Sequence, residues 1–161
     1  MKRIILTALA AVMMLCCLTG CGSKRDPKYI GKWEADQLTF SDVTSSEFLG
    51  VPISALFRFD ISKDGKVEWK SPIDNPVIQN ANEDTEIKWK EISENKLQFT
   101  VYDLTGKNDP ETMELVYRDG KLCIEEDTIS ITLGKVDKFT PVDTDKLNNA
   151  AHAIQDYGIA D

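Results

Sequence analysis

The side chains with the most scope for chemistry are carboxylates, of which the chain has 27 against 19 lysines and arginines. One group, Asp60-x-Ser62-x-Asp64-Gly65, has the spacing that opens a calcium-binding loop. The twelfth position of such a loop should be a bidentate glutamate, but here it is Ser71. A second group, Glu125-Glu126-Asp127, is an acidic run typical of a solvated turn. Neither group predicts a metal site, and carboxylate pairs in so acidic a chain single out no catalytic pair.

Nucleophilic chemistry has equally little support. His152 is the only histidine, and nothing in the sequence links it to Cys123, which therefore lacks the neighbouring base that a reactive thiol needs. No G-x-S-x-G, H-E-x-x-H, paired C-x-x-C or phosphate-loop motif occurs. The formal charge of −8 without a basic stripe argues against nucleic acid as a partner. The sequence predicts no enzyme activity and no cofactor.

The N-terminal segment has the features of an export signal. Lys2 and Arg3 precede an uncharged run of 15 residues from Ile4 to Leu18. That run has the length of the apolar region of a signal peptide and is shorter than the roughly 20 residues that cross a bilayer. It ends at Leu18-Thr19-Gly20-Cys21, an aliphatic residue and two small residues before a cysteine.

This ending resembles the lipobox of bacterial lipoproteins. In that family the thiol, here Cys21, accepts a diacylglyceryl group, and cleavage makes the cysteine the first residue. The resemblance implies a signal peptide over 1–20, a lipidated tether over 21–28 and a domain over 29–161. It also implies attachment to the extracytoplasmic face of the cell membrane. Removing residues 1–20 leaves 17 basic against 27 acidic side chains, and Cys123 is then the only cysteine besides Cys21.

The domain is dominated by alternation of apolar and polar residues, which is the pattern of antiparallel strands with one solvated face. A long connection over 41–53 contains Ser46-Glu47-Phe48-Leu49, which could form one helical turn. The alternation predicts eight strands, at residues 31–40, 54–62, 66–71, 85–92, 96–103, 111–118, 121–126 and 128–134.

The turn residues predict the register of three hairpins. A three-residue loop with Gly65 in the left-handed conformation pairs Phe59 with Trp69 and keeps one face apolar. The same argument, with Asn95 in the left-handed position, pairs Trp89 with Phe99. A two-residue Asp119-Gly120 turn is the preferred reading of the third hairpin, and it pairs Tyr117 with Leu122.

The period changes near the C-terminus, where apolar residues recur every three or four positions from Leu147 to Tyr157. Asp143 or Thr144 can cap the start of a helix, and Gly158 suits its end. We expect an amphipathic helix over about 143–157 that packs on the strands, with a free tail as the alternative.

Eight antiparallel strands followed by a helix are the order of lipocalin-like (calycin) barrels, and Gly31-x-Trp33 resembles the G-x-W element of their first strand. In that family a basic side chain from the last strand covers the tryptophan, a role that Lys135 or Lys138 could take. We expect an all-β, up-and-down barrel with the C-terminal helix, because closure removes exposed strand edges. The alternative architecture is a two-sheet β-sandwich.

Aromatic residues are the remaining lead to function, since they fall on the predicted inner faces of the strands. They either line a cavity for an apolar ligand, as the lipocalin resemblance implies, or fill the barrel completely. The sequence therefore supports two functions: a non-catalytic binding module for a small apolar or amphipathic ligand, or an envelope protein that binds partners with a solid barrel. The residues expected to line the cavity are Trp33, Phe57, Phe59, Trp69, Trp89, Phe99 and Tyr117.

Overall fold

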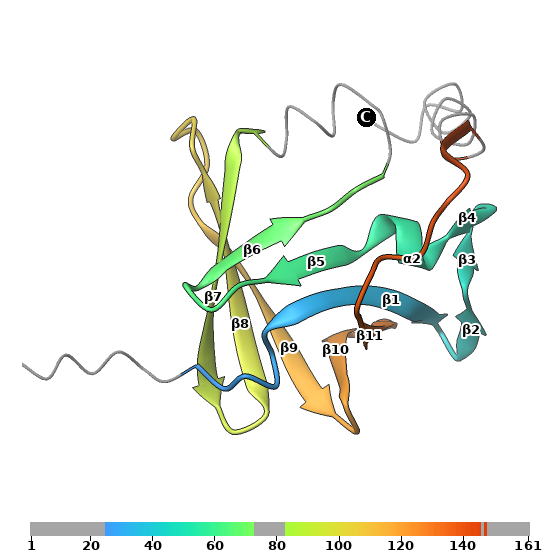
Figure 1. The fold of residues 1–161 in the computed structure, drawn as a ribbon, viewed down its shortest axis with the longest axis horizontal. Coiled ribbons are helices and arrows are strands. Elements are labelled where there is room, and N and C mark those ends of the chain that lie inside the picture. Colours follow the sequence, from blue (N-terminus) through green and yellow to red (C-terminus); the bar gives the residue numbers. More distant parts are fainter. Residues whose placement is uncertain (1–24, 73–82, 146, 148–161) are drawn as a thin grey trace, which may run out of the picture.

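The computed structural model describes residues 25–72, 83–145 and 147, and in it the alternating segments form antiparallel strands (Figure 1). Four of the eight predicted strands have the observed bounds, at 31–40, 96–103, 111–118 and 121–126, and the other four differ at one or both ends. Three further short strands, at 43–45, 47–48 and 51–52, were not predicted. The elements are β1 (Gly31–Phe40), β2 (Val43–Ser45), β3 (Glu47–Phe48), β4 (Val51–Pro52), α2 (Ile53–Leu56), β5 (Arg58–Ile61), β6 (Lys66–Trp69), β7 (Thr85–Ser93), β8 (Lys96–Asp103), β9 (Glu111–Arg118), β10 (Lys121–Glu126) and β11 (Ile129–Val136).

Eight of these strands close into a barrel. Each strand from β5 to β11 pairs with the next along the chain, β5 pairs with β1, and β1 pairs with β11. β2 lies outside the barrel as a short extension of the sheet beside β1, and β3 and β4 form a separate hairpin. The predicted antiparallel up-and-down barrel is confirmed, and the two-sheet alternative is wrong because β11 and β1 join the two ends of the sheet.

The three predicted hairpin registers are confirmed. Phe59 lies opposite Trp69, Trp89 opposite Phe99, and Tyr117 opposite Leu122. The turn residues adopt the expected positive φ angles, 98° at Gly65 and 61° at Asn95. Register follows from the sequence here because the turn chemistry and the apolar face both demand the same pairing.

The strand predicted over 54–62 is wrong in its first half. Ile53–Leu56 forms a single helical turn, α2, in which Phe57 N donates to Ile53 O at 3.2 Å. Pro52, with its φ of −57°, suits the entry to such a turn. The turn lets Ile53 reach the barrel core while Ala55 faces a small apolar cluster outside the barrel, which a strand would not allow.

The helical turn expected at Ser46–Leu49 is also wrong. That segment contributes to the β3–β4 hairpin instead, with Glu47 opposite Pro52 and Phe48 opposite Val51. Leu49 and Gly50 make the connection, and both have positive φ angles. A four-residue stretch carries too little periodicity to distinguish the two conformations.

A segment after β11 crosses the outer face of the barrel (Figure 1) and covers a buried ion pair there. Glu34 of β1 and Arg58 of β5 face each other, 8% and 5% exposed, with Nε and Oε2 3.9 Å apart. Thr140 of the crossing segment donates its backbone N–H to Glu34 at 2.8 Å and accepts from Arg58 at 2.5 Å. Arg58 also donates to Ser54 O, and its guanidinium lies 5.7 Å from the Phe139 ring. The ion pair thereby joins the C-terminal segment to the barrel.

The predicted C-terminal helix over 143–157 lies mostly outside the described residues and stays a prediction. Of its apolar stripe only Leu147 is described, and it is buried in the outer cluster with Val51 and Ala55. The same cluster includes Leu56 and Val142 at its margin.

We predict that Arg58→Ala lowers the free energy of unfolding by about 3–5 kcal/mol, because it leaves the Glu34 carboxylate buried without its cation. Arg118→Ala is the matched control: Arg118 pairs with Glu125 at 3.3 Å on the surface, and its loss should cost about 0–1 kcal/mol. Urea unfolding followed by circular dichroism measures both. Equal losses in the two variants would contradict the structural role of the buried pair.

Candidate functional site

The seven aromatic residues predicted to line a cavity divide into two groups. Trp33, Phe59, Trp89 and Phe99 are buried, and Phe57, Trp69 and Tyr117 are half-buried against the same core. Several of the rings make edge contacts, with Phe59 5.6 Å from Phe99 and Trp33 6.4 Å from Tyr117 between centroids. These ring contacts show that the aromatic side chains pack against one another in the barrel interior. Trp69 differs, because it lies beside a hollow in the barrel wall.

One end of the barrel is closed by an aromatic plug. Tyr29, fully buried, makes edge contacts with Trp89 at 6.1 Å and with Tyr117 at 5.6 Å. Trp33 Nε1 donates to Tyr29 O at 2.8 Å, and Trp89 Nε1 donates to Ser62 O at 2.8 Å. We call this the plugged end. It also carries the β5–β6, β7–β8 and β9–β10 loops. Tyr29 is not among the residues predicted to line the barrel, although its position two residues before Gly31-x-Trp33 placed it at the start of the first strand.

Three cations cover the plug from outside. Lys135 Nζ lies 5.5 Å from the Trp33 ring, as expected for one of the two lysines considered, and also donates to Lys28 O. Lys28 Nζ lies 4.7 Å from Tyr29, and the Arg25 guanidinium lies 5.5 Å from Trp89. The pKa of Lys28 is raised: burial lowers it, but the neighbouring Tyr29 hydroxyl and Asp26 carboxylate outweigh that effect. Lys28 therefore keeps its charge over the rings.

Two glycines make room for these cations. Gly31 has a φ of 129°, and a Cβ there would lie 3.0 Å from Lys135 Cε. Gly65 has a φ of 98°, and a Cβ there would lie 2.3 Å from an Arg25 nitrogen. Both positions therefore favour glycine for two reasons: L-residues rarely adopt such φ angles, and a Cβ would collide with the cation's side chain. The glycine of Gly31-x-Trp33 thus lets the lysine stem reach the tryptophan.

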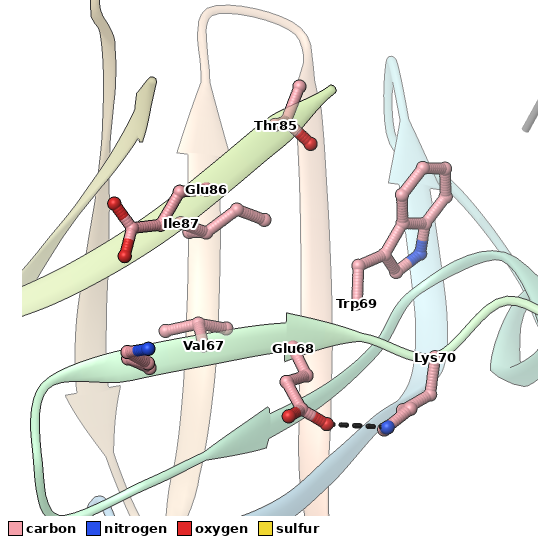
Figure 2. A pocket seen from close by; sticks show the side chains of 8 residues that line it. Val67, Glu68, Trp69, Lys70, Thr85, Glu86 and Ile87 are labelled. Atoms are coloured by element: carbon pink, nitrogen blue, oxygen red, sulfur yellow. Dashed lines mark ion pairs between the residues drawn. The ribbon is translucent and has the colours of Figure 1, made fainter. Parts of the chain in front are cut away.

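The barrel wall opens between β6 and β7, toward the end opposite the plug. These strands pair only at Lys66↔Lys88 and Val67↔Ile87. Beyond those pairs lies a hollow of about 350 Å³, and Figure 2 shows the Trp69 and Ile87 side chains beside it. The lining residues are Lys66, Val67, Glu68, Trp69, Lys70, Thr85, Glu86 and Ile87.

The pairing ends where two carboxylates would next face each other. Continuing the register would set Glu68 directly opposite Glu86, and like charges in that position destabilise a sheet. Each glutamate instead pairs along its own strand, Glu68 with Lys70 at 2.5 Å and Glu86 with Lys88 at 2.9 Å. The opening thus begins at the position where Glu68 would face Glu86, whereas Lys66 and Lys88, also of like charge, remain paired just before it.

The hollow combines an apolar wall with a charged rim. Trp69 Nε1 donates to Leu56 O at 3.0 Å, which fixes the indole orientation beside the hollow. Val67 and Ile87 add aliphatic surface, and lysines and glutamates of both strands surround it. Such a site suits a small amphipathic molecule, since ligand pockets are largely apolar with a few placed polar groups. Of the predicted lining residues, only Trp69 borders this hollow.

A second hollow, of about 360 Å³, lies between the starts of β7 and β9 and the loop that follows β8. Asp103 organises this loop: its carboxylate accepts from Thr105 N at 2.7 Å, Thr105 Oγ1 at 2.6 Å and Asn108 N at 3.0 Å. Hydrogen bonds, that from the Thr105 hydroxyl first, lower the pKa of Asp103 to about 2. The Asp103 carboxylate is thus used in hydrogen bonds within its own loop.

The other residues considered for chemistry have structural partners. Asp64 accepts from Ser62 Oγ and from Lys66 N at 3.1 Å, and the Ser62 hydrogen bond is the main cause that lowers its pKa. Burial raises the pKa of the Cys123 thiol, which disfavours its nucleophilic form. Among the residues that the structure describes, no three His, Cys, Asp or Glu side chains could hold a metal ion. Cys21 and His152 lie outside the described residues.

The geometry defines a closed eight-stranded antiparallel barrel with one plugged end and a hollow in its wall. Comparisons of this chain with protein-family models, curated proteins and solved structures find no match. Within residues 25–72, 83–145 and 147, no helix is long and apolar enough to span a membrane.

We predict that the backbone amide signals of Thr105 and Asn108 titrate with a midpoint of about 2, the pKa of Asp103. The folded-state pKa lies below the ordinary 3.8, so the stability that this carboxylate contributes is present above about pH 4 and is lost as the pH falls toward 2. An NMR pH titration measures the midpoint. Asp103→Asn should abolish the titration, and Asp109→Asn in the same loop should leave it unchanged. A midpoint near 3.8 would contradict the hydrogen-bonded geometry.

Proposed function

We propose that the protein is a lipid-anchored, extracytoplasmic binding module with a lipocalin-like barrel, and that it binds a small apolar or amphipathic ligand without catalysis. The anchor is argued from the charged start, the 15-residue apolar run and the lipobox-like Leu18-Thr19-Gly20-Cys21. The lipocalin likeness is argued from the closed barrel and from Lys135 over Trp33 beside Gly31.

The observation that carries the ligand proposal is the opening between β6 and β7. A barrel that served only as a solid support would gain hydrogen bonds by pairing these strands along their whole length. Here the pairing stops after Val67↔Ile87, where Glu68 would next lie opposite Glu86, and Trp69 borders the hollow beside that point. We place the apolar part of the ligand against Trp69 and Ile87 and its polar part at the lysine and glutamate rim.

A second candidate function is an envelope interaction protein. A row of large apolar side chains is exposed across β11, β1 and β2: Ile129 (40%), Phe40 (55%) and Val43 (69%). Phe40 lies directly opposite each of the other two. An exposed apolar row of this kind favours contact with a protein partner.

We predict that Cys21→Ala abolishes lipid attachment, because the thiol is the proposed acceptor of the diacylglyceryl group. Cells grown with labelled palmitate should give a labelled wild-type chain and an unlabelled, unprocessed variant. Cys123→Ser is the control and should be labelled like the wild type. Normal labelling of the Cys21 variant would refute the anchor.

We predict that the protein extracted gently from its own membranes carries a small molecule, which native mass spectrometry detects as an added mass lost on collisional activation. Trp69→Ala should weaken the affinity about tenfold or more and lower the bound fraction, since burial of an apolar group the size of a side chain contributes roughly 1.5–3 kcal/mol. Leu104→Ala, an exposed apolar residue in a loop, is the matched control and should leave the bound fraction unchanged.

The same measurement separates the two candidate functions. Absence of any small molecule, together with a co-purified envelope protein that Phe40→Ser releases, would favour the interaction protein. Equal ligand retention by the Trp69→Ala variant and the wild type would mean that the hollow is not the binding site.

A further inference from the structure

The chain that leads into the barrel is fixed to the plugged end from Arg25 onward. Arg25 donates to Lys63 O at 3.2 Å, and its guanidinium lies against Gly65 and the Trp89 ring. Asp26 N donates to the Glu91 carboxylate at 3.2 Å. Residues 25–28, which the sequence assigns to the tether, are therefore part of the folded body.

This attachment limits how far the barrel can lie from Cys21. Four peptide units separate Cys21 from Arg25, and a fully extended chain spans at most about 3.6 Å per residue, or about 14 Å in all. A lipid on Cys21 would thus hold Arg25, at the plugged end, within about 14 Å of the bilayer surface, while the tilt of the barrel would depend on other contacts with the surface. The Debye length is about 8 Å at physiological ionic strength, so charges on this end interact with the bilayer whenever the tether is less than fully extended.

The two ends of the barrel carry opposite charge. Residues at and beside the plugged end include ten lysines and arginines against six carboxylates, although the whole chain is acidic. Described residues at the opposite end include fourteen carboxylates against two lysines. The first set is 25–32, 61–67, 91–97, 117–122 and 134–138, and the second is 40–57, 68–72, 83–87, 101–113, 125–129, 139–145 and 147.

We propose that the plugged end docks on an anionic lipid surface, so that the barrel stands on the membrane with its acidic end pointing away. The proposal rests on the lipid anchor proposed above and adds an orientation and a partner to it. Exposed cations from separate parts of the chain, among them Lys63 in the β5–β6 loop and Lys138 after β11, supply the contacts with lipid phosphates. Lys96 and Arg118, at strand ends, can join them by exchanging their surface ion pairs with Glu114 (3.6 Å) and Glu125 (3.3 Å) for lipid phosphates. β8 alone is about 26 Å long, so the carboxylates at the opposite end lie beyond the range of the surface charge.

The orientation can be measured on the full-length lipidated protein. Cys123→Ser first removes the free thiol of the barrel. A nitroxide is then attached to a new cysteine, introduced by Glu94→Cys at the plugged end or by Asp109→Cys at the opposite end. Both changes remove one exposed carboxylate, so the two labelled proteins match in charge. The proteins are reconstituted on vesicles of phosphatidylcholine with 30% phosphatidylglycerol, or of phosphatidylcholine alone, with a nickel-chelating lipid as the relaxing agent.

We expect nickel to enhance the relaxation of the residue 94 label at least fivefold more than that of the residue 109 label on the anionic vesicles. The ratio of the two relaxation enhancements, residue 94 over residue 109, should fall at least twofold on neutral vesicles or in 0.5 M salt. Lys63→Glu with Arg118→Glu should reduce it likewise. The control Lys70→Glu with Lys107→Glu, an equal charge change at the opposite end, should not.

Flotation of the vesicles separates failure of the two proposals. Protein that floats but shows equal relaxation of the two labels would overturn the docking and leave the anchor intact. Protein that floats with the same ratio on neutral and anionic vesicles would overturn the electrostatic cause. Protein that does not float would overturn the anchor and the docking together.

Discussion

Eight residue pairs join β1 to β11, from Lys32↔Val136 to Phe40↔Ile129, and this pairing between distant parts of the chain closes the barrel. It sets Trp33 opposite Lys135, so the lysine is in place to cover the ring. It also delivers the segment after β11 to the outer face of β1, where Thr140 binds Glu34 and Arg58. The plug and the crossing segment therefore both depend on the same closure.

The described cysteine, Cys123, is a free thiol, so the barrel is held by packing and hydrogen bonding. The three tryptophans show how the two combine. Each is wholly or partly buried, and each indole N–H donates to a backbone carbonyl: Trp33 to Tyr29, Trp69 to Leu56 and Trp89 to Ser62. A buried indole without a partner would cost free energy, so these bonds fix the rings in single orientations.

Most of the barrel was predictable from the sequence because local and global signals agree. The alternation of apolar and polar residues selects the same hairpin pairs as the turn residues Gly65, Asn95 and Asp119-Gly120. The segment Ile53–Leu56 was not predictable, because its alternation fits a strand and its helical turn depends on burial of Ala55 against Leu147, which lies far along the chain. Of the candidate site, Trp69 was identified, but the opening beside it was not, because it depends on strand register across a long connection.

The charge pattern distinguishes the two ends of the barrel, with the basic plugged end on one side and the hollow toward the acidic end. A net acidic chain gains solubility from its carboxylates wherever they lie, so solubility does not explain why lysines and arginines gather at the plugged end. Arg25, Lys28 and Lys135 also stabilise the plug through their ring contacts, so this end is closed where it meets the proposed lipid surface. The hollow beside Trp69 lies toward the other end, where β6 and β7 no longer pair. In the proposed orientation, a ligand would enter and leave the hollow from the solvent, while the plugged end stays closed against the bilayer.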